Sequence, residues 1–142
     1  MPVDDLARSD VVTATEETSV SELGQTMADE TVGSVVIVDD EQPVGIVTDR
    51  DLALRCVAEE GDTSDKTAGN VMSENLETVE RTAGFFEAVD VMSDNGIRRL
   101  PVTDDSGELV GILTSDDLTT LLADEQQGLS SVIEAQRAPY NE

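Results

Sequence analysis

Gly-Ile-Val-Thr-Asp-Arg-Asp-Leu, residues 45–52, returns later in the chain as Gly-Ile-Leu-Thr-Ser-Asp-Asp-Leu, residues 111–118. The match extends outward from this stretch. Thr13 and Met27 meet the same residue types 65 positions later, and one additional residue near Ser106-Gly107 moves the offset to 66. A turn is where a single inserted residue is expected. The chain is therefore predicted to hold two copies of one unit of about 60 residues.

Each copy has the pattern of a β-α-β-β-α unit. Apolar residues at helical spacing follow Ser19-Val20-Ser21-Glu22, which has the spacing of a capping box, and the same face returns from Phe85 to Met92. The other expected elements are extended pieces at 11–14 and 76–79, strands at 34–38, 44–47, 99–103 and 110–113, and last helices from 48 and 114. Neither unit can bury its sheet and helices alone. We expect an α/β (α+β) fold of two tandem repeats, packed sheet to sheet as one pseudo-twofold module.

The predicted organisation is a first repeat at 1–61, a linker at 62–69, a second repeat at 70–123 and a C-terminal tail at 124–142. The linker is polar and ends in Gly69. The tail carries Leu129, Val132 and Ile133 before Pro139. Two interpretations of the tail stay open: a short helix that packs on a partner subunit, or a loose end.

The composition excludes several classes of function. The chain has no histidine and one cysteine, Cys56, so it lacks a Ser-His-Asp triad, a histidine metal site and an internal disulfide. The net charge of -24 opposes binding to nucleic acids and to anionic membranes. Paired acids such as Asp39-Asp40 are expected to be solvated rather than to hold a metal. No leader or membrane span is expected, so the predicted location is cytoplasmic.

The acidic excess, with Lys66 as the one lysine, is typical of a protein from a halophilic archaeon. In concentrated salt the self-repulsion of such a chain is screened, and its charge keeps it soluble. A merely acidic protein from an ordinary cytoplasm is the alternative.

The repeated motifs, together with the β-α-β-β-α order and stretches 70–79 and 97–102, resemble a pair of CBS domains, also called a Bateman module. The resemblance covers roughly residues 5–123. It is weaker at the start of the first copy, where Asp5-Leu6-Ala7 stands in place of Val-Met-Ser. It implies a stand-alone regulatory module with no catalysis and no obligatory cofactor. Such modules bind AMP, ADP, ATP or S-adenosylmethionine between their repeats, commonly form homodimers and act on a regulated protein partner.

By the same resemblance, the Thr and the final Asp of the motif bind sugar and phosphate, which points to Thr48 with Asp51 and to Thr114 with Asp117. A carboxylate can accept from both ribose hydroxyls, and a helix start favours an anion. The adenine candidates are Thr13, Ala14, Ser34 and Val35 in one cleft, and Thr78, Val79, Arg99 and Leu100 in the other. The alternative is that both Thr-x-x-Asp stretches only cap helices.

Half of the eight basic residues fall in or beside these clefts: Arg50, Arg55, Arg98 and Arg99. Arginine suits bidentate phosphate contact, so these residues are phosphate candidates, with Arg98-Arg99 the best placed. Pairing with nearby carboxylates is the alternative for each. Gly33-Ser34 replaces this pair in the first copy, so the two clefts are expected to differ. The rival functions are a ligand-free dimerisation scaffold and, more remotely, a metal-dependent hydrolase.

Overall fold

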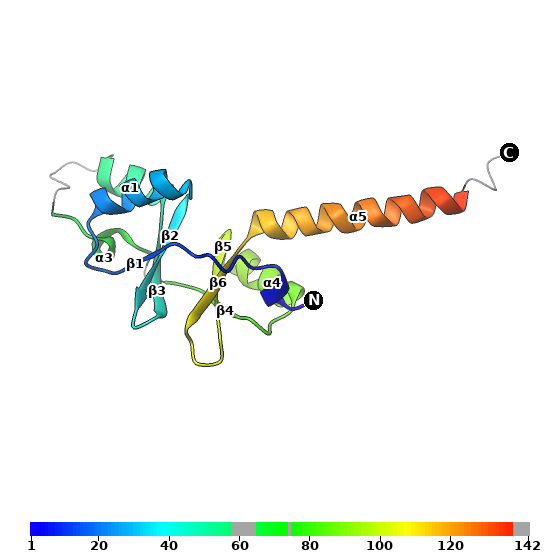
Figure 1. Ribbon diagram of the computed structural model, residues 1–142, viewed down its shortest axis with the longest axis horizontal. Coiled ribbons are helices and arrows are strands. Elements are labelled where there is room, and N and C mark those ends of the chain that lie inside the picture. The colour runs from blue at the N-terminus through cyan, green and yellow to red at the C-terminus, as the bar shows by residue number, and fades with distance from the viewer. Residues whose placement is uncertain (58–64, 74, 138–142) are drawn as a thin grey trace.

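The computed structural model describes residues 1–57, 65–73 and 75–137, and it contains two three-stranded sheets of identical topology (Figure 1). In each sheet a short first strand runs parallel to the second, and the second pairs antiparallel with the third. The strands are β1 (Thr13–Ala14), β2 (Ser34–Asp39) and β3 (Gln42–Thr48), then β4 (Val79–Glu80), β5 (Arg99–Thr103) and β6 (Leu109–Thr114). The predicted mixed fold of two β-α-β-β-α repeats is confirmed.

The helices occur at matching places in the two repeats. They are α1 (Val20–Glu30), α2 (Asp49–Leu52) with its π-helical extension η2 (Ala53–Val57), α4 (Phe85–Asn95) and α5 (Ser115–Arg137), and the short segments η1 (Val3–Asp5) and α3 (Ala68–Val71) precede the two repeats. The Ser19 Oγ accepts a hydrogen bond from the Glu22 N–H at the start of α1, as the capping spacing predicts. Both α1 and α4 end in a left-handed residue, Thr31 and Gly96.

The inserted residue lies in the second hairpin. The first hairpin turns over Asp40 and Glu41 alone, both with positive φ, between the paired residues Asp39 and Gln42. The equivalent pairs of the two hairpins are Val38 with Pro43, which enclose four residues, and Thr103 with Leu109, which enclose five, with Gly107 at φ 83°. In the second hairpin the Asp104 carboxylate accepts the N–H groups of residues 106 and 108, which holds the longer turn.

Each sheet buries one face under its own helices. In the first repeat Leu23 and Met27 of α1 pack with Val35, Ile37 and Val47. The equivalent core of the second repeat includes Ala88, Met92, Leu100, Val102 and Leu113. Side chains alternate along a strand, so Val36 and Pro101 face away from these helices. Both are nevertheless fully buried, which shows that the opposite faces of β2 and β5 are covered as well.

The two repeats exchange their starting segments. The Val3 N–H donates to the Ala83 carbonyl at 2.8 Å, and the Ala68 N–H donates to the Thr18 carbonyl at 2.7 Å, a contact that matches at an offset of 65. Val3 thereby belongs to the core of the second repeat, whereas Ala68 and Val71 belong to the core of the first. Residues 65–69 of the predicted linker lie within the described chain and residues 62–64 lie outside it. The domain boundaries stay a prediction.

The last helix is longer than the sequence pattern indicates. Helix α5 runs without a break from Ser115 to Arg137 and projects away from the sheets (Figure 1). It carries the first part of the predicted tail, and residues 138–142 lie outside the described chain. Leu122, Leu129, Val132 and Ile133 are each more than half exposed along it.

Candidate functional site

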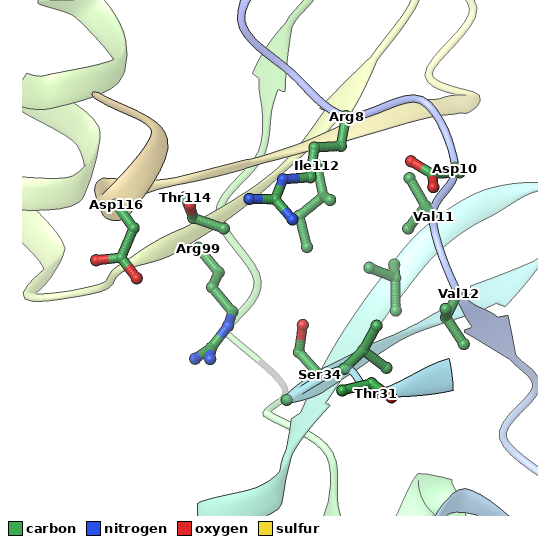
Figure 2. A pocket seen from close by; sticks show the side chains of 13 residues that line it. Arg8, Asp10, Val11, Val12, Thr31, Ser34, Arg99, Ile112, Thr114 and Asp116 are labelled. Atoms are coloured by element: carbon green, nitrogen blue, oxygen red, sulfur yellow. The ribbon is translucent and has the colours of Figure 1, made fainter. Parts of the chain in front are cut away.

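A pocket opens between the two repeats (Figure 2). Its volume is about 270 Å³, close to the lower end of the range of roughly 300–1,000 Å³ for small-ligand sites. The first repeat and its leading segment contribute Arg8, Asp10, Val11, Val12, Thr31, Val32, Gly33, Ser34 and Val36, and the second repeat contributes Arg99, Ile112, Thr114 and Asp116. We call this the interrepeat pocket. It takes shape only when both repeats are present.

The pocket combines an apolar lining with charged groups at its edge. Apolar side chains from both repeats provide a surface against which a flat ring can pack. The charged lining residues are two arginines, Arg8 and Arg99, and two aspartates, Asp10 and Asp116. In Figure 2 both guanidinium groups lie in the opening, between Asp116 of one repeat and Ser34 of the other. The lining charges therefore balance, although the chain carries -24 in total.

Both repeated motifs form capping boxes at the ends of β3 and β6. The Asp117 N–H donates to the Thr114 Oγ1 at 3.1 Å, and the Thr114 N–H donates to the Asp117 Oδ2 at 3.2 Å. Thr48 and Asp51 repeat this geometry: the Asp51 N–H donates to the Thr48 Oγ1 at 3.1 Å, and the Thr48 N–H donates to the Asp51 Oδ2 at 2.9 Å. The capping interpretation thus describes both motifs. Each cap occupies one carboxylate oxygen, so capping does not use up the hydrogen-bonding capacity of either aspartate.

The second motif has a partner that the sequence analysis did not single out. The Arg8 Nη2 lies 3.1 Å from the Asp117 Oδ1, the oxygen that the cap leaves available. Backbone hydrogen bonds in both directions between Arg8 and Ile112 hold this segment against β6. The Ser73 N–H donates to the Ile46 carbonyl at the corresponding place, so Arg8 matches Ser73 at the offset of 65. The placing of Asp5-Leu6-Ala7 against Val-Met-Ser was therefore wrong by one residue: Leu6-Ala7-Arg8 matches Val71-Met72-Ser73. Keeping the offset of 65 at the start of the first copy would have found Arg8.

The structure brings together three of the predicted site residues. Ser34, Arg99 and Thr114 line the interrepeat pocket, and Asp117 adjoins it through Arg8. Ser34 and Arg99 were assigned to different clefts, but here they share one. The reason is that Arg99 crosses to the first repeat, where its Nη2 would lie 3.2 Å from a Cβ placed on Gly33.

Other predicted residues lie elsewhere. Val35 and Leu100 are fully buried in the two separate cores, so only their backbone groups remain candidates for ligand contact. Ala14 is half-buried against the first core. Thr78 and Val79 line a hollow that also holds Glu80 and Glu87.

Thr13 lies in a strongly acidic place. It lines a shallow hollow with Glu41 and Glu108, where the two hairpins meet and the Leu109 N–H donates to the Glu41 carbonyl. The Glu41 carboxylate, followed by Asp104, raises the pKa of Glu108 above its ordinary value. Because like charges already repel one another here, this hollow is ill suited to a phosphate group.

The remaining predicted arginines separate into two kinds. Arg55 is structural: its Nη1 donates to the Val71 carbonyl at 2.6 Å, at the end of α3. This bond helps to hold the exchanged segment on the first repeat. Arg50 and Arg98 are exposed. Neither lines the interrepeat pocket.

Two observations limit the chemistry of the described residues. Within residues 1–57, 65–73 and 75–137, no group of three or more Cys, Asp or Glu side chains is arranged to hold a metal ion. No helix in those same ranges has the length and apolar content to cross a bilayer.

Residues 3–57 and 68–124 match the CBS domain, so the chain belongs to the CBS domain family and carries two copies of the domain. The uncharacterised protein MK0525 of Methanopyrus kandleri is 40% identical over 117 residues, which cover 82% of this chain and 60% of that relative. The chain thus spans less than two thirds of that relative's length.

Solved structures are similar over most of the chain. A putative signal-transduction protein with CBS domains from Burkholderia ambifaria has a TM-score of 0.78 at 26% identity, and the match covers 89% of this chain and 96% of that one. The CBS domain pair of protein MJ0100 has a TM-score of 0.78 at 28% identity, with 88% and 98% covered. That pair was solved in complex with 5′-methylthioadenosine and S-adenosyl-L-methionine.

Proposed function

We propose that this protein is a regulatory module that binds an adenosine-containing ligand in the interrepeat pocket and does not itself catalyse a reaction. The observation that carries the proposal is the position of the pocket. Residues of both repeats line it, and the second Thr-x-x-Asp motif stands at its edge. The complex of the MJ0100 pair with two adenosine derivatives supports the ligand class. A ligand that contacts both repeats would favour the arrangement in which they are close, and this arrangement is what a partner protein would sense.

A calorimetric titration tests this function. Nucleotide-free protein is titrated with AMP, ATP and S-adenosylmethionine in concentrated KCl, the condition that the acidic surface favours. We expect saturable binding of at least one ligand. The Ser34→Tyr variant fills the pocket and is expected to weaken that binding by about tenfold or more, because each 1.4 kcal/mol of lost contact changes affinity tenfold.

The matched control is Ser21→Tyr, which adds the same ring on an exposed face of α1. Silence for all three ligands would contradict the proposed function. It would favour the rival scaffold function, for which Asp51→Ala and Asp117→Ala each cost only a helix cap, about 1 kcal/mol.

We also propose that the module works as a homodimer paired through α5. Leu122, Leu129, Val132 and Ile133 recur at helical spacing and are 56%, 65%, 59% and 56% exposed. A groove of about 320 Å³ between α4 and α5 adjoins this stripe at Leu122, and Phe85, Val89, Met92 and Leu118 line it.

A second copy is the occupant that fits both features. The stripe lies along α5, and the groove between α4 and α5 adjoins it at Leu122, so an antiparallel α5 pair about a twofold axis near Gly128 would cover each stripe with the other copy. At 100° per residue, Asp116, Asp124 and Glu134 fall on the opposite side of the helix, whereas Glu125 falls on the side of the stripe. The four stripe residues are each more than half exposed, so pairing would remove apolar surface from water on both copies.

Light scattering after gel filtration tests the pairing. We expect the wild type to have twice the mass of one chain and Leu129→Asp to have the mass of one chain, because the substitution buries an unpaired charge at the contact. Ser131→Asp places the same charge on the far side of α5 and is expected to stay dimeric. A wild type of single-chain mass would contradict the pairing, as would equal disruption by both variants.

A further inference from the structure

We infer that Arg8, together with Arg99, makes the interrepeat pocket selective for adenosine ligands that carry a 5′-phosphate over adenosine itself and over cationic S-adenosylmethionine. This inference rests on the proposed function and adds the ligand class. Arg8 comes from the segment that leads to β1 in the first repeat, and Arg99 comes from β5 of the second. Two guanidinium groups therefore reach one opening from different parts of the chain (Figure 2).

Arg8 neutralises the aspartate of the second motif. Asp117 is 15% exposed, and its two oxygens are occupied by the Thr114 N–H and by Arg8. Arg8 thus compensates the negative charge of Asp117, which a ligand bound at this motif must approach. Without it, Asp117 together with the neighbouring Asp116 would repel a phosphate and attract a sulfonium.

The Arg8 guanidinium can also bind a phosphate oxygen. The Arg8 side chain is 66% exposed, so the pair with Asp117 is solvated and contributes little to stability. The guanidinium has five N–H donors in a planar fork, and one contact to Asp117 leaves donors for a phosphate oxygen. Arg8 can therefore bind a phosphate at the pocket edge while its backbone stays bonded to Ile112.

Arg99 supplies the second cation at the pocket edge. Its guanidinium lies beside Gly33 of the first repeat, where the Asp49 carboxylate also lies: the Arg99 Nη2 and the Asp49 Oδ2 would be 3.2 and 3.6 Å from a Cβ placed on Gly33. In the described part of the chain Arg99 forms no ion pair within 4 Å, so its guanidinium keeps donors for an anion at the pocket edge, while the nearby Asp49 offsets part of its charge. Gly33 matters here because a Cβ at that position would crowd the guanidinium.

The two motifs are not equivalent in this respect. Ser73 stands where the repeat offset places Arg8, and in the described ranges no arginine pairs with Asp51. Selection for phosphate through a motif-bound arginine is thus a property of the second motif. This difference arises from a residue outside the repeated Gly-x-x-Thr-x-x-Asp stretch.

Calorimetry with AMP, adenosine and S-adenosylmethionine tests the inference on the wild type, Arg8→Gln and Arg81→Gln. Arg81 is the matched control because it also makes an exposed ion pair of 3.1 Å, with Asp4, but does not line the pocket. We expect AMP to bind at least tenfold more tightly than adenosine or S-adenosylmethionine. Arg8→Gln should reduce that preference about tenfold by weakening AMP alone, since a hydrogen bond to a charged group is lost. Arg81→Gln should change neither affinity, and thermal melts without ligand verify that all three proteins fold.

The outcomes separate this inference from the function on which it rests. If adenosine or S-adenosylmethionine binds as tightly as AMP, the selectivity is wrong and the proposed function stands. If Arg8→Gln weakens AMP and adenosine equally, or Arg81→Gln weakens AMP as much as Arg8→Gln does, Arg8 does not select the phosphate. If no ligand binds, the proposed function itself fails.

Discussion

Leu100→Ala is expected to lower the free energy of unfolding by about 2–5 kcal/mol, the range for removing a large aliphatic side chain from a packed core. Leu100 lies on β5, the middle strand of its sheet, is fully buried, and packs with Val102, Leu113 and Met92 under α4. The substitution leaves a cavity that a strand held on both sides in a sheet cannot close. A loss of this size in the free energy of unfolding would identify Leu100 as a core residue rather than as the adenine contact that the sequence suggested.

Chemical denaturation measures this loss, and Leu54→Ala is the control. Leu54 lies in η2, at the end of the first repeat, and its side chain is 51% exposed. Its truncation should therefore change the free energy of unfolding by less than about 1 kcal/mol. If Leu100→Ala instead kept nearly full stability and weakened nucleotide binding, Leu100 would belong to the site and the core assignment would be wrong.

Gly111→Ala is expected to destabilise the protein by about 1–3 kcal/mol and to impair nucleotide binding together with stability. A Cβ at Gly111 would lie 2.9 Å from the Arg8 carbonyl oxygen and 3.3 Å from the Ala7 Cβ. The backbone at Arg8 cannot step aside without stretching its two hydrogen bonds of 2.9 Å to Ile112. The variant therefore moves the segment that carries Arg8 away from Asp117 and the pocket.

Gly45→Ala provides the matched comparison in the first repeat. There the new Cβ would meet the Met72 side chain, whose Sδ lies nearest at 2.5 Å. A thioether can rotate away, so the cost should be lower, and adding Met72→Ala should recover part of it. Ala7→Gly should not rescue Gly111→Ala, because the obstructing atom belongs to the backbone. Denaturation of the four variants measures these differences, and rescue by Ala7→Gly would contradict the proposed cause.

Much of the fold could be predicted because its signals are local. Apolar runs at Ser34–Val38 and Arg99–Thr103 specify strands, and the repeat offset places their partners. The length of α5 could not be predicted in this way. Gly128 and the polar residues 124–127 interrupt the apolar pattern. The glycine costs a helix only about 1 kcal/mol, and the flanking Leu, Ala, Glu and Gln residues favour helix enough to carry it through.

The site was less predictable because it depends on which segments meet. Thr-x-x-Asp spacing specifies a cap, and both caps are present. That spacing carries no information about Arg8, which reaches Asp117 across 109 positions of sequence. Equally, no local sequence pattern predicts that Ser34 lines the pocket while its neighbour Val35 is buried in the core of the first repeat. Only the alternation of side chains along β2 makes that distinction, once the covered faces are known.

The exchanged starting segments have a consequence for how such a chain can be divided. A fragment cut at the linker would leave the first sheet without Ala68 and Val71 and the second without Val3. Two separate single-repeat polypeptides could restore these contacts by trading segments with one another. The tandem module therefore resembles a domain-swapped dimer whose two protomers are joined in one polypeptide. Its two repeats are expected to unfold as one cooperative unit.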